Sequence, residues 1–375
     1  MKTPGSPLSQ NCLLLVGIVS TLVAGEVAVP AATPEGDAPG TLSVTGSWSF
    51  DNPSTQDHTG DQRFTVLVRG RQYLIAFESR RAFSPGYTIV TSDGVDTFST
   101  SNPLDWTPPS GLAPVRPKES KSRFATGAVY PSSFPTGEGM VPAQVLWLAY
   151  CYPCQANLRI SSTNVLPFNT VTGYKVAPVT EFKTKAALTN TAVEQLDFYA
   201  PGRGSDSQRG GEYEFPPPYA SGWLQSRFLG TGFTTLQALS IPRSVTFQDF
   251  TTKKDASGPE DVAPFGTYRV SAAEMTVLDE FPPVFPPLAS DGKTIVNDHR
   301  LTKAGGEPLG FAVGENGNFA LRESPEFRDM QRNLRKEARR KLLASVTFYL
   351  VLGGALLLFG WKIMQRQKSD EVPAG

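Results

Sequence analysis

The sequence has few of the residues on which many reaction centres depend. Its 375 residues include only 3 cysteines and 2 histidines. Three cysteines exclude a disulfide-rich scaffold and a zinc site of four cysteines. The 35 basic and 35 acidic residues cancel, and a balanced charge gives no sign of a protein built to bind nucleic acid. We therefore expect no cofactor, no metal and no nucleic-acid partner.

Motifs for catalysis are also scarce. The chain has no Gly-x-Ser-x-Gly elbow, and neither His58 nor His299 stands in the context of a catalytic triad. Gly202-Arg203-Gly204-Ser205 lacks the Gly-Lys-Ser/Thr ending of a phosphate-binding loop. The sequence therefore predicts that the protein is not an enzyme.

Cys151-Tyr152-Pro153-Cys154 is the sharpest local motif. Its spacing resembles the thioredoxin active site, where one thiolate is exposed at the start of a helix and has a lowered pKa. The flanking sequence lacks the alternating strands and helices of a thioredoxin fold. Cys151 and Cys154 are thus a candidate disulfide or redox pair if the domain is exported, and two free thiols otherwise.

Two apolar segments predict a signal peptide and a membrane anchor. Residues 12–25 have the length of a signal-peptide core and are too short to span a bilayer. The segment from Leu342 to Trp361 carries no charge and spans roughly 30 Å as a helix. We predict a signal peptide over 1–25, a flexible spacer over 26–40, a transmembrane helix over 342–363 and a cytoplasmic tail over 364–375.

A basic helix is expected directly before the membrane segment. Ser324-Pro325-Glu326 is typical of a helix start, with an N-cap serine, a first-turn proline and an acid. We predict a basic juxtamembrane helix over 324–341, either solvated or lying near anionic lipid head groups. Its candidate membrane-surface contacts are Arg332, Arg335, Lys336, Arg339, Arg340 and Lys341.

The signals for topology conflict. More positive charge precedes the membrane segment than follows it, which alone favours a cytosolic domain with a membrane anchor at the tail. The signal peptide favours export. Because large domains translocate largely regardless of charge, we predict a single-pass membrane protein whose N-terminal domain lies outside the cytoplasm.

Residues 41–321 are predicted to form a β-rich domain. Alternation and turn residues indicate hairpins through Arg69-Gly70-Arg71-Gln72 and through Ser92-Asp93-Gly94. Residues 186–197 show a helical pattern, and 201–218 resemble a loop. Further strands are expected at 145–150, 222–229, 244–250, 267–271, 274–278, 294–296 and 310–313.

The order of these hairpins resembles the opening of lipoprotein-carrier (LolA-like) half-barrels. The residues concerned are Phe64–Val68, a tight turn, a strand ending in Phe77, and a strand that leads into Ser92-Asp93-Gly94. More loosely, residues 166–174, 268–278 and 296–300 resemble exported bacterial membrane-anchored proteins. The LolA-like resemblance implies a curved antiparallel sheet whose apolar concave face holds acyl chains. The membrane anchor departs from soluble carriers and puts a shuttling role in doubt.

The fold class predicted is therefore mainly β, a curved antiparallel sheet (half-barrel or sandwich) with a C-terminal basic helix that runs into one transmembrane helix. The expected function is a non-enzymatic, membrane-anchored protein of the cell envelope that binds a hydrophobic ligand or lipid. The alternatives are an interaction or structural subunit of a membrane complex, which binds another envelope protein, and a tail-anchored protein that faces the cytosol.

Overall fold

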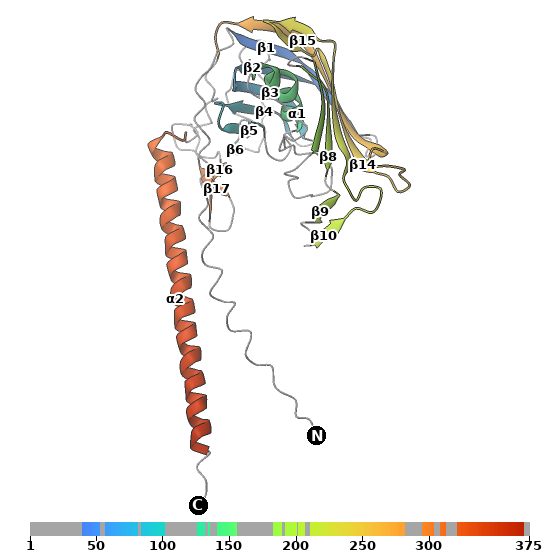
Figure 1. Cartoon of the computed structure of the whole chain (residues 1–375). Helices are drawn as coiled ribbons and strands as arrows, with labels where there is room; N and C mark the ends of the chain where they lie inside the picture. Colours follow the sequence, from blue (N-terminus) through green and yellow to red (C-terminus); the bar gives the residue numbers. More distant parts are fainter. Residues whose placement is uncertain are drawn as a thin grey trace, which may run out of the picture. The chain divides into compact units, whose positions relative to one another are not determined.

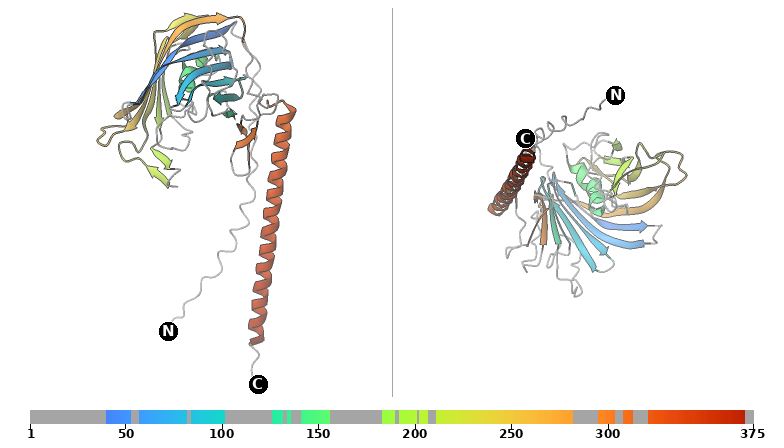
Figure 2. Two further views of the ribbon diagram at one scale, coloured as in Figure 1. Left: turned by 180° about the vertical axis from the view of Figure 1, so that it is seen from behind. Right: turned by 90° about the horizontal axis from the view of Figure 1, so that it is seen from below.

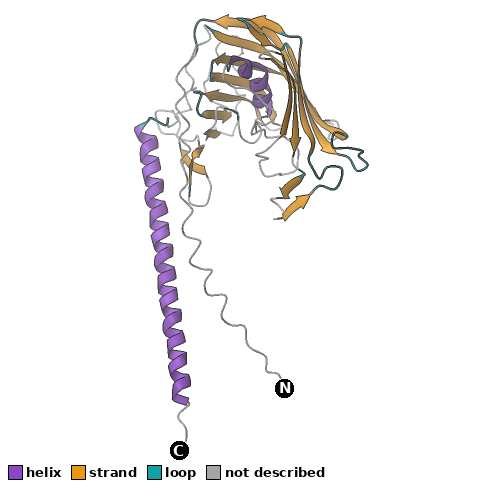
Figure 3. Ribbon diagram, viewed as in Figure 1, coloured by secondary structure: helices purple, strands orange, loops and turns teal. Residues whose placement is uncertain are grey.

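The computed structural model describes thirteen stretches of the chain: residues 40–52, 57–81, 84–101, 126–131, 134–135, 141–155, 183–189, 192–200, 202–206, 211–281, 295–303, 308–312 and 321–370. The predicted signal peptide, nearly all of the predicted spacer and the last five residues of the predicted tail lie outside them. Strands account for most of the described domain, and one long helix follows it (Figure 3). The expected class, mainly β with a C-terminal helix, is confirmed.

One large sheet contains thirteen strands, in the order β17-β16-β6-β5-β4-β3-β2-β1-β15-β14-β11-β8-β7. It is curved but not closed into a barrel, and it is mixed, because β16 pairs with β6 in parallel. The bounds are β1 (Thr41–Asn52), β2 (Asp57–Arg69), β3 (Gln72–Arg81), β4 (Ser84–Ser92), β5 (Thr97–Ser101), β6 (Thr126–Tyr130), β7 (Lys183–Thr189), β8 (Ala192–Ala200), β11 (Trp223–Thr231), β14 (Ser244–Thr252), β15 (Val262–Leu278), β16 (Ile295–Thr302) and β17 (Pro308–Ala312).

Both predicted hairpins are confirmed. Strands β2 and β3 are joined at Gly70, whose φ of 56° suits a residue without a side chain. Strands β4 and β5 are joined through Asp93, whose carboxylate accepts the backbone N–H groups of Val95 and Asp96 at 2.8 Å. These two hydrogen bonds stabilise the turn. The turn places Asp96 in the interior.

A short helical segment packs against the inner face of the sheet. It consists of α1 (Val141–Leu146), the π-helical η1 (Trp147–Cys151) and the 3₁₀-helical η2 (Tyr152–Cys154). Figures 1 and 2 show α1 inside the curve of the sheet. Its side chains join the main core with residues of β1, β2 and β3. The predicted strand at 145–150 is wrong, because an apolar run buried on all sides has no periodicity that separates strand from helix.

Two further local predictions are wrong. The helical pattern at 186–197 belongs to the antiparallel pair β7 and β8, where the sheet supplies the burial that the pattern ascribed to a helix. Part of the predicted loop at 201–218 forms a small hairpin of β9 (Arg203–Asp206) and β10 (Gly211–Glu214). A second small hairpin pairs β12 (Thr234–Leu236) with β13 (Leu239–Ile241).

The C-terminal helix α2 runs unbroken over Pro325–Asp370. Ser324 caps it, because its Oγ accepts the backbone N–H of Phe327 at 3.2 Å. Its apolar side chains from Leu342 to Ile363 are mostly exposed. Among the described residues, α2 is the one helix long and apolar enough to cross a membrane.

Candidate functional site

The inner face of the sheet is an aromatic surface shared with the helical segment. Phe64 of β2 and Phe77 of β3 are cross-strand neighbours. Phe64 stacks on Tyr150 of η1 with ring centroids 5.8 Å apart, and Trp48 of β1 meets Phe77 edge-on at 6.1 Å. Phe64, Val66 and Val68 therefore share one face of β2, and residues of Val141–Cys154 cover it.

The cysteine pair lies in this core and is poorly suited to redox chemistry. Cys151 is fully buried and Cys154 is 9% exposed, and both are free thiols. Burial raises the pKa of Cys151 well above its usual value, and the neighbouring Cys154 adds to that shift. Burial also raises the pKa of Cys154 to about 12. A reactive thiol needs the opposite shift. Whether the two thiols form a disulfide after export stays a prediction.

Several polar atoms of this core lack a hydrogen bond. In the described part of the chain, the indole N–H groups of Trp48, Trp147 and Trp223 and the hydroxyl of Tyr150 are buried without a partner. Buried polar groups in native proteins are nearly always hydrogen-bonded. The hydroxyl of Tyr219 in the same core follows that rule, since it donates to the Asp261 carbonyl at 2.6 Å. The unpartnered atoms are mostly donors, so an acceptor-bearing molecule suits them.

Asp249 of β14 supplies a buried carboxyl group to this region. It is fully buried, and Ser226 donates a hydrogen bond to its Oδ1 at 2.7 Å. No residue that the structure describes bonds to its Oδ2. Burial raises the pKa of Asp249 to about 7, against the opposing hydrogen bond from Ser226. A carboxyl with a pKa of about 7 is mostly neutral below pH 7 and mostly charged above it.

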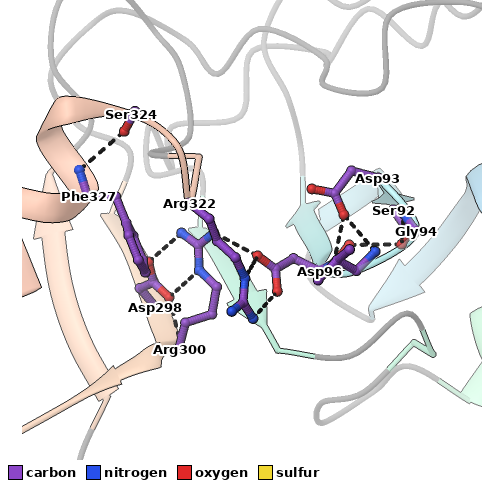
Figure 4. Close-up of polar contacts among 10 residues, drawn as sticks. Ser92, Asp93, Gly94, Asp96, Asp298, Arg300, Arg322, Ser324 and Phe327 are labelled. Atoms are coloured by element: carbon purple, nitrogen blue, oxygen red, sulfur yellow. Dashed lines mark hydrogen bonds and ion pairs between the residues drawn. The ribbon is translucent and has the colours of Figure 1, made fainter. Parts of the chain in front are cut away.

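A second polar group, the Asp96 cluster, lies where the turn before β5, β16 and the start of α2 meet (Figure 4). We define it as Asp96, Asp298, Arg300 and Arg322. Arg322 donates to both carboxylate oxygens of Asp96 at 2.7 and 2.8 Å. Arg300 donates to Asp96 at 3.0 Å and to both oxygens of Asp298 at 2.7 and 2.9 Å. The two buried carboxylates are thus matched by two guanidinium groups.

Two aromatic rings lie close to the guanidinium group of Arg300. Its guanidinium carbon lies 5.6 Å from the ring centroid of Phe98 and 4.5 Å from that of Phe327. Phe327 belongs to the first turn of α2, and it also packs on Leu301 of β16. The cluster therefore contacts the helix itself as well as the residues that precede it.

The predicted membrane-surface residues lie along the exposed length of α2. Arg335, Lys336, Arg339 and Arg340 are exposed. Arg332 pairs with Asp329 at 3.3 Å and Lys341 with Glu337 at 2.8 Å, both within the helix. Elsewhere, burial lowers the pKa of His299, whose ring stacks on Tyr130 at 4.4 Å. No group of three His, Cys, Asp or Glu side chains in the described ranges is placed to hold a metal ion.

Sequence reasoning missed the Asp96 cluster and Asp249. The cluster joins residues more than 200 positions apart, and no local pattern links them. Asp249 did carry a signal. In Val245-Thr246-Phe247-Gln248-Asp249 the alternation places the acid on the same face as Val245 and Phe247.

Comparison with known proteins gives little more. No model of a protein family matches the sequence, and no curated protein matches it. Among solved structures, a LolA superfamily protein from Nitrosomonas europaea is 12% identical, with a TM-score of 0.25, over 65% of this chain and 88% of that chain. This match agrees with the weak LolA-like resemblance seen in the sequence. At that TM-score it carries no argument about function.

Proposed function

We propose that the chain is a single-pass, membrane-anchored, non-enzymatic protein of the cell envelope that binds a hydrophobic ligand. For its domains we propose the boundaries that the sequence predicts, with the β-rich domain outside the cytoplasm and a short tail inside. The unpartnered polar atoms on the aromatic inner face carry the proposal. They have a partner once a lipid carbonyl lies between the sheet and Val141–Cys154.

The anchor is supported by the exposed surface of α2. A run of exposed leucine, phenylalanine and valine side chains is costly in water, at about 25 cal/mol for each Å². In a bilayer the same side chains are solvated by acyl chains.

The basic residues of α2 fall at two levels. Arg339, Arg340 and Lys341 lie within about 5 Å of Leu342 along the helix axis, the depth of a head-group layer. Arg332, Arg335 and Lys336 lie roughly 9 to 15 Å from it. Their attraction to anionic lipids therefore acts over about one Debye length and weakens with salt.

The ligand class follows from charge. Among the described residues, the buried side chains of the inner face include no lysine, arginine or histidine, and this face buries one carboxyl, that of Asp249. An anionic head group placed there would have no counter-charge. We therefore propose an uncharged acyl lipid whose ester carbonyl accepts from Trp48 or Tyr150.

The test is a binding cycle on the full-length protein in nanodiscs. Radiolabelled dioleoylglycerol, its ether-linked analogue and oleate are offered to the wild type and to Trp48→Phe, which keeps the ring and removes the N–H. Loss of one hydrogen bond weakens ester binding about 5-fold. Ether binding should be equal in both proteins. Trp361→Phe, on exposed α2, is the matched control.

Each other outcome is informative. Tighter binding of oleate than of the diester would overturn the ligand class but keep a hydrophobic ligand. Binding of none of the three would overturn the ligand proposal and favour the interaction-subunit alternative. Phosphatase fused after Phe319 reports the topology separately, and an inactive fusion would favour the cytosol-facing alternative.

A further inference from the structure

Three distant parts of the chain meet at Asp96. Arg300 reaches it across 204 residues of sequence and Arg322 across 226. Asp96 and Asp298 are fully buried, and the Arg300 side chain is only 2% exposed. A contact of this kind is made once the whole domain is folded, and it joins the sheet to the residues that enter α2.

The geometry of the Asp96 cluster restricts movement in several directions. Arg322 donates hydrogen bonds to Asp96 from two nitrogens, and Arg300 donates two to Asp298 in the same way. Such fork-to-carboxylate pairs fix the orientation of two groups as well as their distance. Phe327 adds the first turn of α2 to the contact, because its ring lies against Arg300.

The helix beyond the cluster offers no hinge. Between Pro325 and Gly353 the sequence of α2 contains neither glycine nor proline, the residues at which helices usually kink. Phe327 and Leu342, the start of the apolar segment, are about 22 Å apart along the axis.

We propose that the Asp96 cluster and the first part of α2 form a rigid strut. The strut holds the β16 end of the sheet about 20 Å from the hydrocarbon core. Sheet and membrane helix then move as one body, and the domain does not swing on its anchor. This inference does not depend on the proposed ligand.

Spin-label distances test the strut in the full chain in nanodiscs. One label is placed at Arg71→Cys in the exposed β2–β3 turn, in a Cys12→Ser background. The second is placed at Asn333→Cys or at Lys341→Cys. Cys151 and Cys154 are buried and take no label. In the wild type we expect both distance distributions to be single and narrow.

Two variants break the strut at different points. Arg322→Ala opens the cluster, so both distributions should become at least twice as wide. Ala338→Pro breaks the helix below Asn333, so only the distance to Lys341 should widen. Arg322 is 48% exposed at its side chain, and Ala338 is an exposed residue of α2, so neither change empties the core.

The matched control is Arg269→Ala, which removes an exposed pair with Asp51 at 3.8 Å. It should leave both distributions unchanged. Narrow distributions in Arg322→Ala, or a broad distance from Arg71 to Asn333 in the wild type, would overturn the proposal.

Discussion

Two regions of the domain each bury a carboxyl group completely, Asp96 beside β5 and Asp249 on β14. Asp96 receives hydrogen bonds from two arginines, whereas Asp249 receives one from a serine. In the first region, two guanidinium groups lie against the buried carboxyl. The second leaves its carboxyl without a counter-charge, and burial raises the pKa of Asp249 to about 7, so that it is mostly protonated only below that pH. The cluster is therefore suited to holding parts together, and the inner face fits the uncharged ligand that we propose for it.

The largest effect is expected from Asp96→Asn. It removes the negative charge between two guanidinium groups and leaves Arg322 without its carboxylate. Breaking a buried pair from one side costs about 3 to 5 kcal/mol. The free energy of unfolding, measured with denaturant, should fall by about that amount. Asp51→Asn, at an exposed pair, should change it by less than about 0.5 kcal/mol, and equal losses in both variants would contradict the comparison.

Asp249→Asn should raise the free energy of unfolding relative to the wild type, and it should do so only above acidic pH. The pKa of Asp249 is about 7 in the folded state, against 3.8 as its ordinary value. Its contribution to stability is therefore complete below about pH 4 and is lost as the pH rises through 7. A difference of about three pKa units corresponds to about 4 kcal/mol.

Unfolding curves from pH 4 to pH 8 check this sign. The wild type should lose stability over that range relative to Asp249→Asn, which has no proton to release at this position. The variant should thus be the more stable protein at pH 8. A stability difference that does not change with pH would mean that Asp249 is charged in the folded protein.

The smallest change in stability is expected from two tyrosine variants of the inner face. Tyr219 donates to the Asp261 carbonyl and accepts the backbone N–H of Lys253 at 2.9 Å, so Tyr219→Phe should cost about 1 to 2 kcal/mol. The Tyr150 hydroxyl has no partner among the described residues, so Tyr150→Phe should be neutral or stabilising in lipid-free protein. Thermal unfolding compares the two, and a larger loss for Tyr150→Phe would remove the basis for the ligand proposal.

Local signals were enough for the hairpins and for the long helix. The turn at Gly70, the Asx-type turn at Asp93 and the cap at Ser324 each depend on contacts within a few residues. Such contacts are visible in the sequence because turn and cap chemistry is specific to residue type.

The rest depended on tertiary structure. The segment 145–150 is apolar throughout, so its periodicity does not separate a buried helix from a buried strand. Residues 186–197 form strands because β8 pairs with β7 on one side and with β11 on the other. To predict the pairing of Asp96 with Arg322, one must know where two loops of the fold come together. One sequence alone does not give this.

The order of strands also constrains how the chain is made. The first strand, β1, pairs with β15 roughly 220 residues later, so a growing chain cannot complete the middle of its sheet until most of the domain has emerged. Arg322 and α2 emerge later still. The anchor can therefore close on the domain only after the sheet exists, and any chain that stops short of Arg322 leaves Asp96 with one arginine instead of two. The pairing of Asp96 with Arg322 is therefore among the last contacts of the domain that the growing chain can form.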